Sequence, residues 1–97
     1  MNTTTLELSI ELPKVFDMFA ISNVNEEWSR KIIEIPSKVI INCKHVAFID
    51  SPAISLLFKF RNQLIRNGCI LELHNVDGNL LHFFNVTSLD KYFTIYK

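Results

Sequence analysis

The stretch around Asp50 and Ser51 constrains this chain more than any other. Residues 46–49 form an apolar, strand-like run, Asp50 and Ser51 follow it directly, and a long amphipathic pattern begins at once. Ser51 and Pro52 suit the N-cap and the first position of a helix over 52–67. The order therefore predicts an exposed hydroxyl at a helix N-terminus, where unpaired N–H groups create a positive potential.

Three roles are open for the Ser51 hydroxyl. As a helix cap alone it would contribute about 1 kcal/mol. As a phosphoacceptor it would add about −1.5 to −2 charges at one point, which a helix N-terminus can tolerate within the fold. The third role is direct contact with a partner without modification.

Composition narrows the function classes. The 97 residues indicate one domain, 1–97, and the 48% of hydrophobic residues allows a core without metals or disulfides. Lys+Arg and Asp+Glu number ten each, so no basic surface for nucleic acid is expected. Residues 1–5 lack a signal-peptide pattern, and no apolar run approaches the roughly 18 residues of a membrane span. We therefore expect a cytoplasmic protein without direct membrane insertion, with Cys43 and Cys69 buried and reduced.

Hydrophobic periodicity predicts the element order β-β-α-β-α-β-α-β. Pro13 and Lys14 read as a turn that joins the first two strands into a hairpin. Strands that alternate with helices then imply right-handed crossovers and a mainly parallel sheet. The predicted fold class is α/β, a single domain with helices packed on a mixed, mostly parallel sheet that starts with an N-terminal hairpin. The strands are expected over 6–12, 15–21, 38–42, 69–73 and 92–96, and the helices over 25–35, 52–67 and 80–86.

The helix over 52–67 is unusually apolar. Its apolar arc spans roughly 200°, well beyond the ~100° stripe that a one-sided surface helix needs. Either neighbouring helices cover the extra flank, or Ile54 and Phe58, extended by Arg61, form a partner surface beside Ser51.

Catalytic and metal-binding patterns have little support. His45, His74 and His82 lie on different predicted elements without metal-ligand spacing, and neither cysteine has a CxxC neighbour. Asp50 beside Ser51 lacks a nearby histidine that could serve as a base. We expect no catalytic residue, no cofactor and no metal.

Four segments together resemble one family over nearly the whole chain: residues 39–51, residues 66–73, residues 81–89 and, less closely, residues 22–25. They are similar, in order and spacing, to the STAS family, the bacterial anti-sigma-factor antagonist domain. Its pattern is a hydrophobic strand, a polar loop, Asp-Ser opening a helix, a glycine stop, a further strand and a closing helix.

This resemblance implies a protein interaction module in signalling and transcription regulation. In the switchable members, a partner anti-sigma kinase of the GHKL type phosphorylates the Ser after the Asp, which is Ser51 here. The unphosphorylated form binds the kinase and releases the sigma factor. The expected partner-binding residues are Asp50, Ser51, Pro52, Ile54, Ser55 and Phe58.

The chain departs from the family pattern in three places. Pro52 and Ala53 stand where a small residue and Gly are usual, and Pro52 has no N–H to donate to a phosphate. Residues 22–25 replace Gly-Glu-Leu-Asp, and Asn42 replaces a common Asp. These changes favour an alternative that the resemblance also implies: a regulatory subunit of a phospholipid-transport ABC transporter that binds the ATPase subunit. A subunit of a larger complex of several STAS proteins is a third possibility.

Overall fold

The computed structural model describes residues 6–97; residues 1–5, on which the signal-peptide expectation depends, lie outside the described residues. The strands of residues 6–97 form two sheets: a four-stranded sheet in the order β1-β3-β5-β6 and a two-stranded sheet of β2 and β4. Every pair of neighbouring strands in them is parallel. The α/β class and the mostly parallel sheet are therefore confirmed. In chain order the elements are β1 (Glu7–Glu11), β2 (Val15–Phe16), α1 (Ile21–Lys31), β3 (Lys38–Asn42), β4 (Phe48–Ile49), α2 (Ser51–Arg66), β5 (Ile70–His74), α3 (Gly78–Val86), the 3₁₀ turn η1 (Leu89–Lys91) and β6 (Thr94–Ile95).

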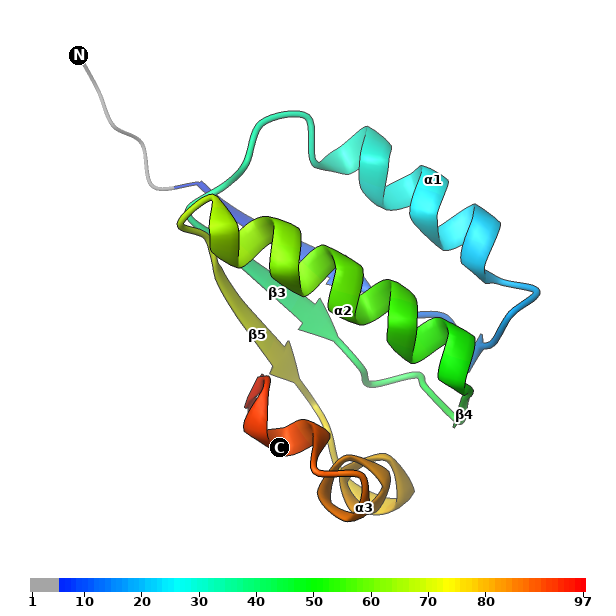
Figure 1. Ribbon diagram of the computed structural model, residues 1–97. Coiled ribbons are helices and arrows are strands. Elements are labelled where there is room, and N and C mark those ends of the chain that lie inside the picture. The colour runs from blue at the N-terminus through cyan, green and yellow to red at the C-terminus, as the bar shows by residue number, and fades with distance from the viewer. Residues whose placement is uncertain (1–5) are drawn as a thin grey trace.

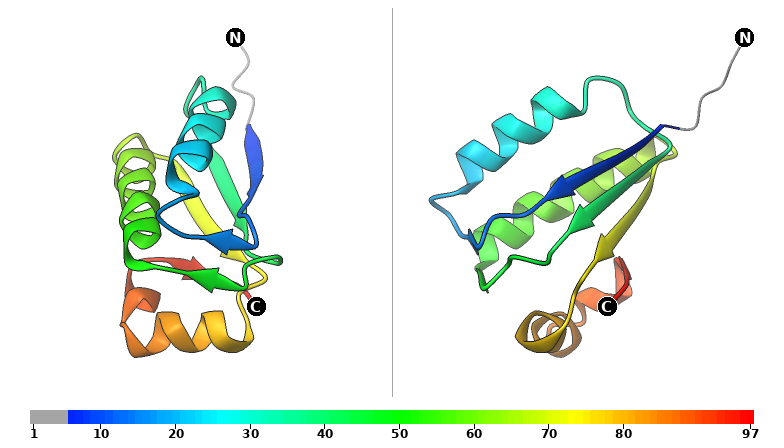
Figure 2. Two further views of the ribbon diagram at one scale, coloured as in Figure 1. Left: turned by 90° about the vertical axis from the view of Figure 1, so that its right-hand side faces the viewer. Right: turned by 180° about the vertical axis from the view of Figure 1, so that it is seen from behind.

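Helices α1 and α2 lie side by side on one face of the four-stranded sheet, and α3 lies beyond the end of β5 (Figure 1). Seen edge-on, the opposite face of the sheet carries no helix of residues 6–97 (Figure 2). The core fills the space between the sheet and the two helices, with Trp28 of α1 in contact range of Phe16 and Phe60. Within the described residues no helix is both long and apolar enough to cross a bilayer.

The predicted N-terminal hairpin is wrong. β1 pairs with β3 and β2 pairs with β4, so the chain continues past Pro13 and Lys14 in the same direction. The Leu12 N–H donates to the Asn42 carbonyl, and the Ala47 N–H donates to the Lys14 carbonyl. These bonds keep the chain from β1 to β2 beside the chain from β3 to β4, although Pro13 interrupts the strand pairing. Two-residue hairpin loops need a positive φ at their first position, which the proline ring excludes.

The second predicted strand is correct only at Val15–Phe16, and the first helix begins earlier than expected. Residues 22–25, interpreted as a break, lie inside α1. The helix starts early because Asp17 Oδ1 accepts the N–H groups of Phe19 and Ala20, which turns the chain directly after β2. Val24 then extends the buried stripe of Trp28 by one helical turn.

Both cysteines are buried and free, as predicted. Burial raises the pKa of the Cys43 thiol to about 12, so it remains protonated and unreactive at neutral pH. The glycine stop is confirmed too: Gly68 follows α2 with a φ of +80°, a left-handed conformation that suits glycine.

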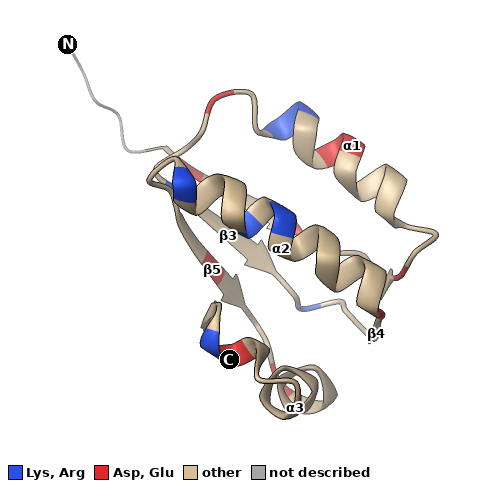
Figure 3. Ribbon diagram, in the orientation of Figure 1, with Lys and Arg blue, Asp and Glu red and all other residues tan. Residues whose placement is uncertain are grey.

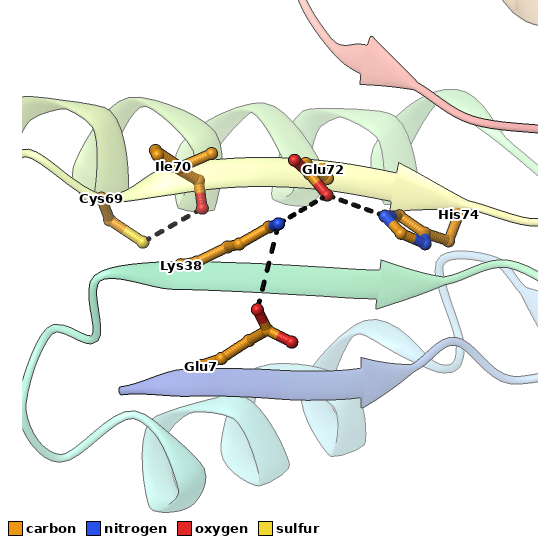
Figure 4. Close-up of polar contacts among 6 residues, drawn as sticks. All are labelled: Glu7, Lys38, Cys69, Ile70, Glu72 and His74. Atoms are coloured by element: carbon orange, nitrogen blue, oxygen red, sulfur yellow. Dashed lines mark hydrogen bonds and ion pairs between the residues drawn. The ribbon is translucent and has the colours of Figure 1, made fainter. Parts of the chain in front are cut away.

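The helix-free face of the sheet carries a charged network (Figure 4). Glu72 of β5 is almost fully buried, and its Oε1 lies 2.8 Å from His74 Nε2 and 3.3 Å from Lys38 Nζ. Lys38 also lies 3.9 Å from the Glu7 carboxylate on β1. The hydrogen bond from His74, with the Lys38 charge, lowers the pKa of Glu72 despite the desolvation that opposes it.

Replacing Glu72 by glutamine is expected to destabilise the protein at pH 7. A carboxyl whose pKa is lowered by folding stabilises the native state above its ordinary pKa, and this contribution is lost as the pH falls through the lowered value. The difference in urea midpoint between wild type and Glu72→Gln should therefore become smaller as the pH falls from about 5 to about 3, the range in which glutamate side chains usually titrate. Glu34→Gln is the control, because that side chain is exposed and is not part of the network. A difference that does not change with pH would contradict the assignment.

Candidate functional site

The candidate site is the corner where β4 ends and α2 begins. Asp50 has extended backbone geometry, and its Oδ1 accepts the Ala53 N–H at 3.0 Å, so Asp50 is the N-cap of α2. Its Oδ2 accepts the Met18 N–H at 2.9 Å, from the turn between β2 and α1. One carboxylate thus joins the start of α2 to a segment 32 residues earlier in the chain.

The prediction that Ser51 is the N-cap is wrong by one residue. Ser51 is the first residue of α2, and Pro52 is the second. Both side chains are exposed, as is Ser55 one turn further on, whose hydroxyl donates to the Ser51 carbonyl at 3.2 Å. Because Asp50 caps the helix, the role of Ser51 as a cap alone is removed, and phosphorylation and direct partner contact remain as its possible roles.

The first turn of α2 offers few N–H donors to an anion at Ser51. Pro52 has none, the Ala53 N–H is held by Asp50 Oδ1, and the Ile54 N–H donates to the Asp50 carbonyl at 3.0 Å. A phosphoryl group on Ser51 would lie beside the Asp50 carboxylate and would compete with it for the Ala53 N–H. It would therefore add charge that the helix start neutralises only weakly.

The apolar flank of α2 is partly covered from within the molecule. Ile54 and Phe58 are half-buried, and the Phe58 ring lies 5.4 Å from that of Tyr92 and 5.2 Å from that of Phe93. The Arg61 guanidinium lies 5.7 Å from the centre of the Tyr92 ring, and its Nε donates to the Tyr92 carbonyl. The segment between η1 and β6, rather than a helix, thus accounts for much of the wide apolar arc, and Phe58 has only part of its ring available to a partner.

Charge is distributed unevenly along α2 (Figure 3). Residues 51–58 carry no charged side chain, whereas Lys59, Arg61 and Arg66 occupy the second half of the helix. The exposed side of the first two turns of α2 therefore carries no charge and mixes hydroxyls with apolar groups, as the surfaces that bind other proteins often do. The charged residue at the start of the helix is the partly exposed Asp50.

The turn that contains Met18 is the part of the corner that the hydrophobic pattern does not predict, because this pattern indicates a strand over 15–21. The available signal was Asp17, whose side chain can accept backbone N–H groups two and three residues later and so favours a turn over a strand. His45 and His74 lie elsewhere, in pairs with Glu11 and Glu72. Among the described residues no cluster of three or more His, Cys, Asp or Glu side chains is placed to hold a metal ion.

A family model described as STAS domain matches residues 2–97. The chain belongs to the STAS domain family. No match to a curated protein reaches significance. This STAS domain has the fold of three solved structures, all at low sequence identity.

One of these structures is a sulfate transporter family protein from Wolinella succinogenes, with a TM-score of 0.79 and 20% identity, over 93% of this STAS domain and 75% of that chain. A second is the anti-sigma factor antagonist SpoIIAA in its unphosphorylated form, with a TM-score of 0.75 and 18% identity, over 100% and 85% of the two chains. The third is the SulP transporter STAS domain from Vibrio cholerae, with a TM-score of 0.71 and 19% identity. The match covers 98% of this STAS domain and 77% of that chain.

Proposed function

We propose that this STAS domain is a non-enzymatic interaction module of the anti-sigma-factor antagonist type. Its partner is a cytoplasmic anti-sigma factor with a GHKL-type serine kinase domain, which docks on the start of α2. The observation that carries the proposal is the exposed Ser51 hydroxyl, which directly follows Asp50 and is not used as the helix cap. The similar fold of an anti-sigma factor antagonist supports this choice of partner.

In this proposal the corner residues have distinct roles. Ser51, Pro52 and Ser55 are exposed and contact the partner, and Ser51 is also the phosphorylation site. Ile54 and Phe58 add the exposed edges of half-buried side chains. Asp50 acts by holding the corner together, because both of its oxygens accept hydrogen bonds from the chain itself.

Ser51→Asp is expected to weaken binding to the kinase at least tenfold, about 1.4 kcal/mol, because it places a second carboxylate beside that of Asp50 in the surface that the partner covers. Ser51→Ala should bind as wild type does. Isothermal titration calorimetry with the purified kinase measures both. Incubation of wild type with the kinase and ATP, followed by intact mass spectrometry, should show one added phosphoryl group, which Ser51→Ala lacks.

Ser37→Asp is the matched control, since Ser37 is exposed and lies before β3, at the opposite end of the sheet from Ser51. It adds the same charge and should leave binding unchanged. Equal affinities for Ser51→Asp and Ser51→Ala would rule out the switch.

A specific observation favours a second candidate function. The first turn of α2 has few free N–H groups for a phosphate, because Pro52 has none and Asp50 holds the one on Ala53. Binding that does not need phosphorylation fits this geometry, as expected of a regulatory subunit that contacts the ATPase of a phospholipid-transport ABC transporter. Two of the structures with this fold are of transporter proteins.

Affinity purification of the tagged full chain from its own cells separates the two functions. Recovery of a GHKL-type kinase supports the antagonist function, and recovery of an ATPase with its permease supports the transporter function. The affinity for the purified partner, measured with and without phosphorylated Ser51, then tests whether modification matters.

A further inference from the structure

The two margins of the four-stranded sheet differ in how much open edge they present (Figure 2). At one margin, β6 is a two-residue strand, and a strand this short offers little edge for another chain to pair with. At the other margin, β1 has five residues and pairs with β3 alone among the described strands. The outer side of β1 is therefore the longer open edge of this sheet.

The backbone of β1 directs hydrogen-bonding groups toward this open side. The Leu12 N–H donates to the Asn42 carbonyl, so the backbone groups of residue 12 face β3. Along a strand the direction of these groups alternates, so the N–H and C=O groups of three residues point outward: Glu7, Ser9 and Glu11. Within residues 6–97 no hydrogen bond uses them. They are free to pair with an added strand.

A groove lies beside the end of β1. Its volume is about 520 Å³, and it lies between residues 11–13 and the part of α1 and its N-terminal turn within 20–30. Leu12 and Val24 form an apolar floor. Leu8, which points to the core side of β1, is only half-buried at the margin of the sheet. Apolar side chains of an added strand that point to the side of α1 would therefore cover apolar surface.

The opposite side of the same edge is acidic. Glu7 and Glu11 lie on the helix-free face, where Figure 4 shows Glu7 beside Lys38. The Glu7 side chain is 54% exposed and lies 3.9 Å from Lys38, and the Glu11 side chain is 62% exposed and lies 3.1 Å from His45. Ion pairs this exposed are weak, so both carboxylates remain able to attract the basic groups of an incoming strand.

These charges argue against a second copy of the chain as the occupant. An antiparallel pair of two β1 strands that uses all three outward residues of each copy places Glu7 of one copy directly opposite Glu11 of the other, twice. Like charges directly opposite each other destabilise a strand pair. A strand with Lys or Arg at two positions four residues apart places opposite charges at the same points.

We propose that the outer side of β1 binds an extended segment of another protein as an added strand. The segment carries Lys or Arg opposite Glu7 and Glu11, and it carries apolar residues at the positions that point to the side of α1. Backbone hydrogen bonds to the three outward residues provide the affinity, and the alternation of basic and apolar side chains provides the specificity. This edge is in a different sheet from the strand that leads to Ser51, so the inference does not depend on the proposed function.

The first test uses a defined probe, a seven-residue peptide of alternating valine and lysine that is blocked at both ends. The control peptide has glutamate in place of lysine. Amide hydrogen exchange of the full chain is followed by nuclear magnetic resonance. At about 1 mM the lysine peptide should slow exchange at the amides of Glu7, Ser9 and Glu11 by tenfold or more, and the glutamate peptide should not.

Variants of β1 test the backbone pairing and the charge separately. Ser9→Pro removes an outward N–H, and an edge strand tolerates proline where the N–H faces solvent. It should keep the urea midpoint of wild type and weaken binding of the lysine peptide at least tenfold. Ser9→Ala keeps the N–H and should bind as wild type does. The double variant Glu7→Lys with Glu11→Lys should prefer the glutamate peptide.

Four results would overturn the proposal. The first is a wild-type chain whose outward amides gain no protection from the lysine peptide, and the second is equal binding of the two peptides. A large fall in the urea midpoint of Ser9→Pro would show that the Ser9 N–H is needed inside the sheet. Sedimentation that shows a wild-type dimer and a Ser9→Pro monomer would identify a second copy as the occupant. The kinase titration at Ser51 is a separate measurement, so failure here leaves the proposed function standing.

Discussion

Trp28→Ala is expected to reduce the free energy of unfolding by about 3–5 kcal/mol, the usual cost of truncating a buried aromatic residue. Trp28 is 1% exposed, and its ring lies 4.3 Å from that of Phe60 and 6.4 Å from that of Phe16. It therefore joins α1 to α2 and to β2. A small domain has about 5–15 kcal/mol in total, so this one substitution would leave a marginal fold. Urea unfolding followed by circular dichroism measures the loss.

Trp28→Phe is the informative comparison. The Trp28 Nε1 group is buried, and no described residue accepts its hydrogen bond. Phenylalanine keeps an aromatic ring against Phe60 and removes a donor whose desolvation is not compensated. We expect a loss well below that of Trp28→Ala, and Ile33→Ala, at an exposed site, should cost less than about 0.5 kcal/mol. A loss for Trp28→Phe as large as that for Trp28→Ala would contradict this account of the core.

Asp50→Ala is expected to cost about 2 kcal/mol, because it removes the cap of α2 and the bond to the Met18 N–H together. Asn at this position keeps one oxygen and should recover part of the loss. Ser51→Ala should be neutral within about 0.5 kcal/mol, because Ser51 lies inside the helix and does not cap it. Urea midpoints of the three variants at pH 7 provide the comparison.

The ranking of these variants tests the corner directly. If Ser51 were the cap, Ser51→Ala would be the costly change and Asp50→Ala would be mild. Amide hydrogen exchange at Met18 gives a second measurement, since its N–H loses an acceptor in Asp50→Ala and should exchange faster. Unchanged protection of that amide would show that the bond does not hold the turn.

The site was partly predictable because its signals are local. The signals lie within a few residues of one another: an apolar run, then Asp50 and Ser51, then a helical pattern. The structure places Ser51 exposed at the start of a 16-residue helix. The choice of cap was not predictable in this way. Asp50 has two carboxylate oxygens, so it can accept the local Ala53 N–H and the distant Met18 N–H at the same time, and the second partner is supplied only by the tertiary fold.

Residue type and short spacing are enough to predict the strand and helix periods, the neutral charge, the burial of the two cysteines and the position of the Asp-Ser corner. Two other features are set by contacts across the fold: β1 and β2 run parallel to β3 and β4, and Phe19 stays outside the core. Alternation along a strand shows which side chains are buried but does not specify the neighbouring strand. Pairing depends on how α1 returns the chain to the sheet, and that is a property of contacts far apart in sequence.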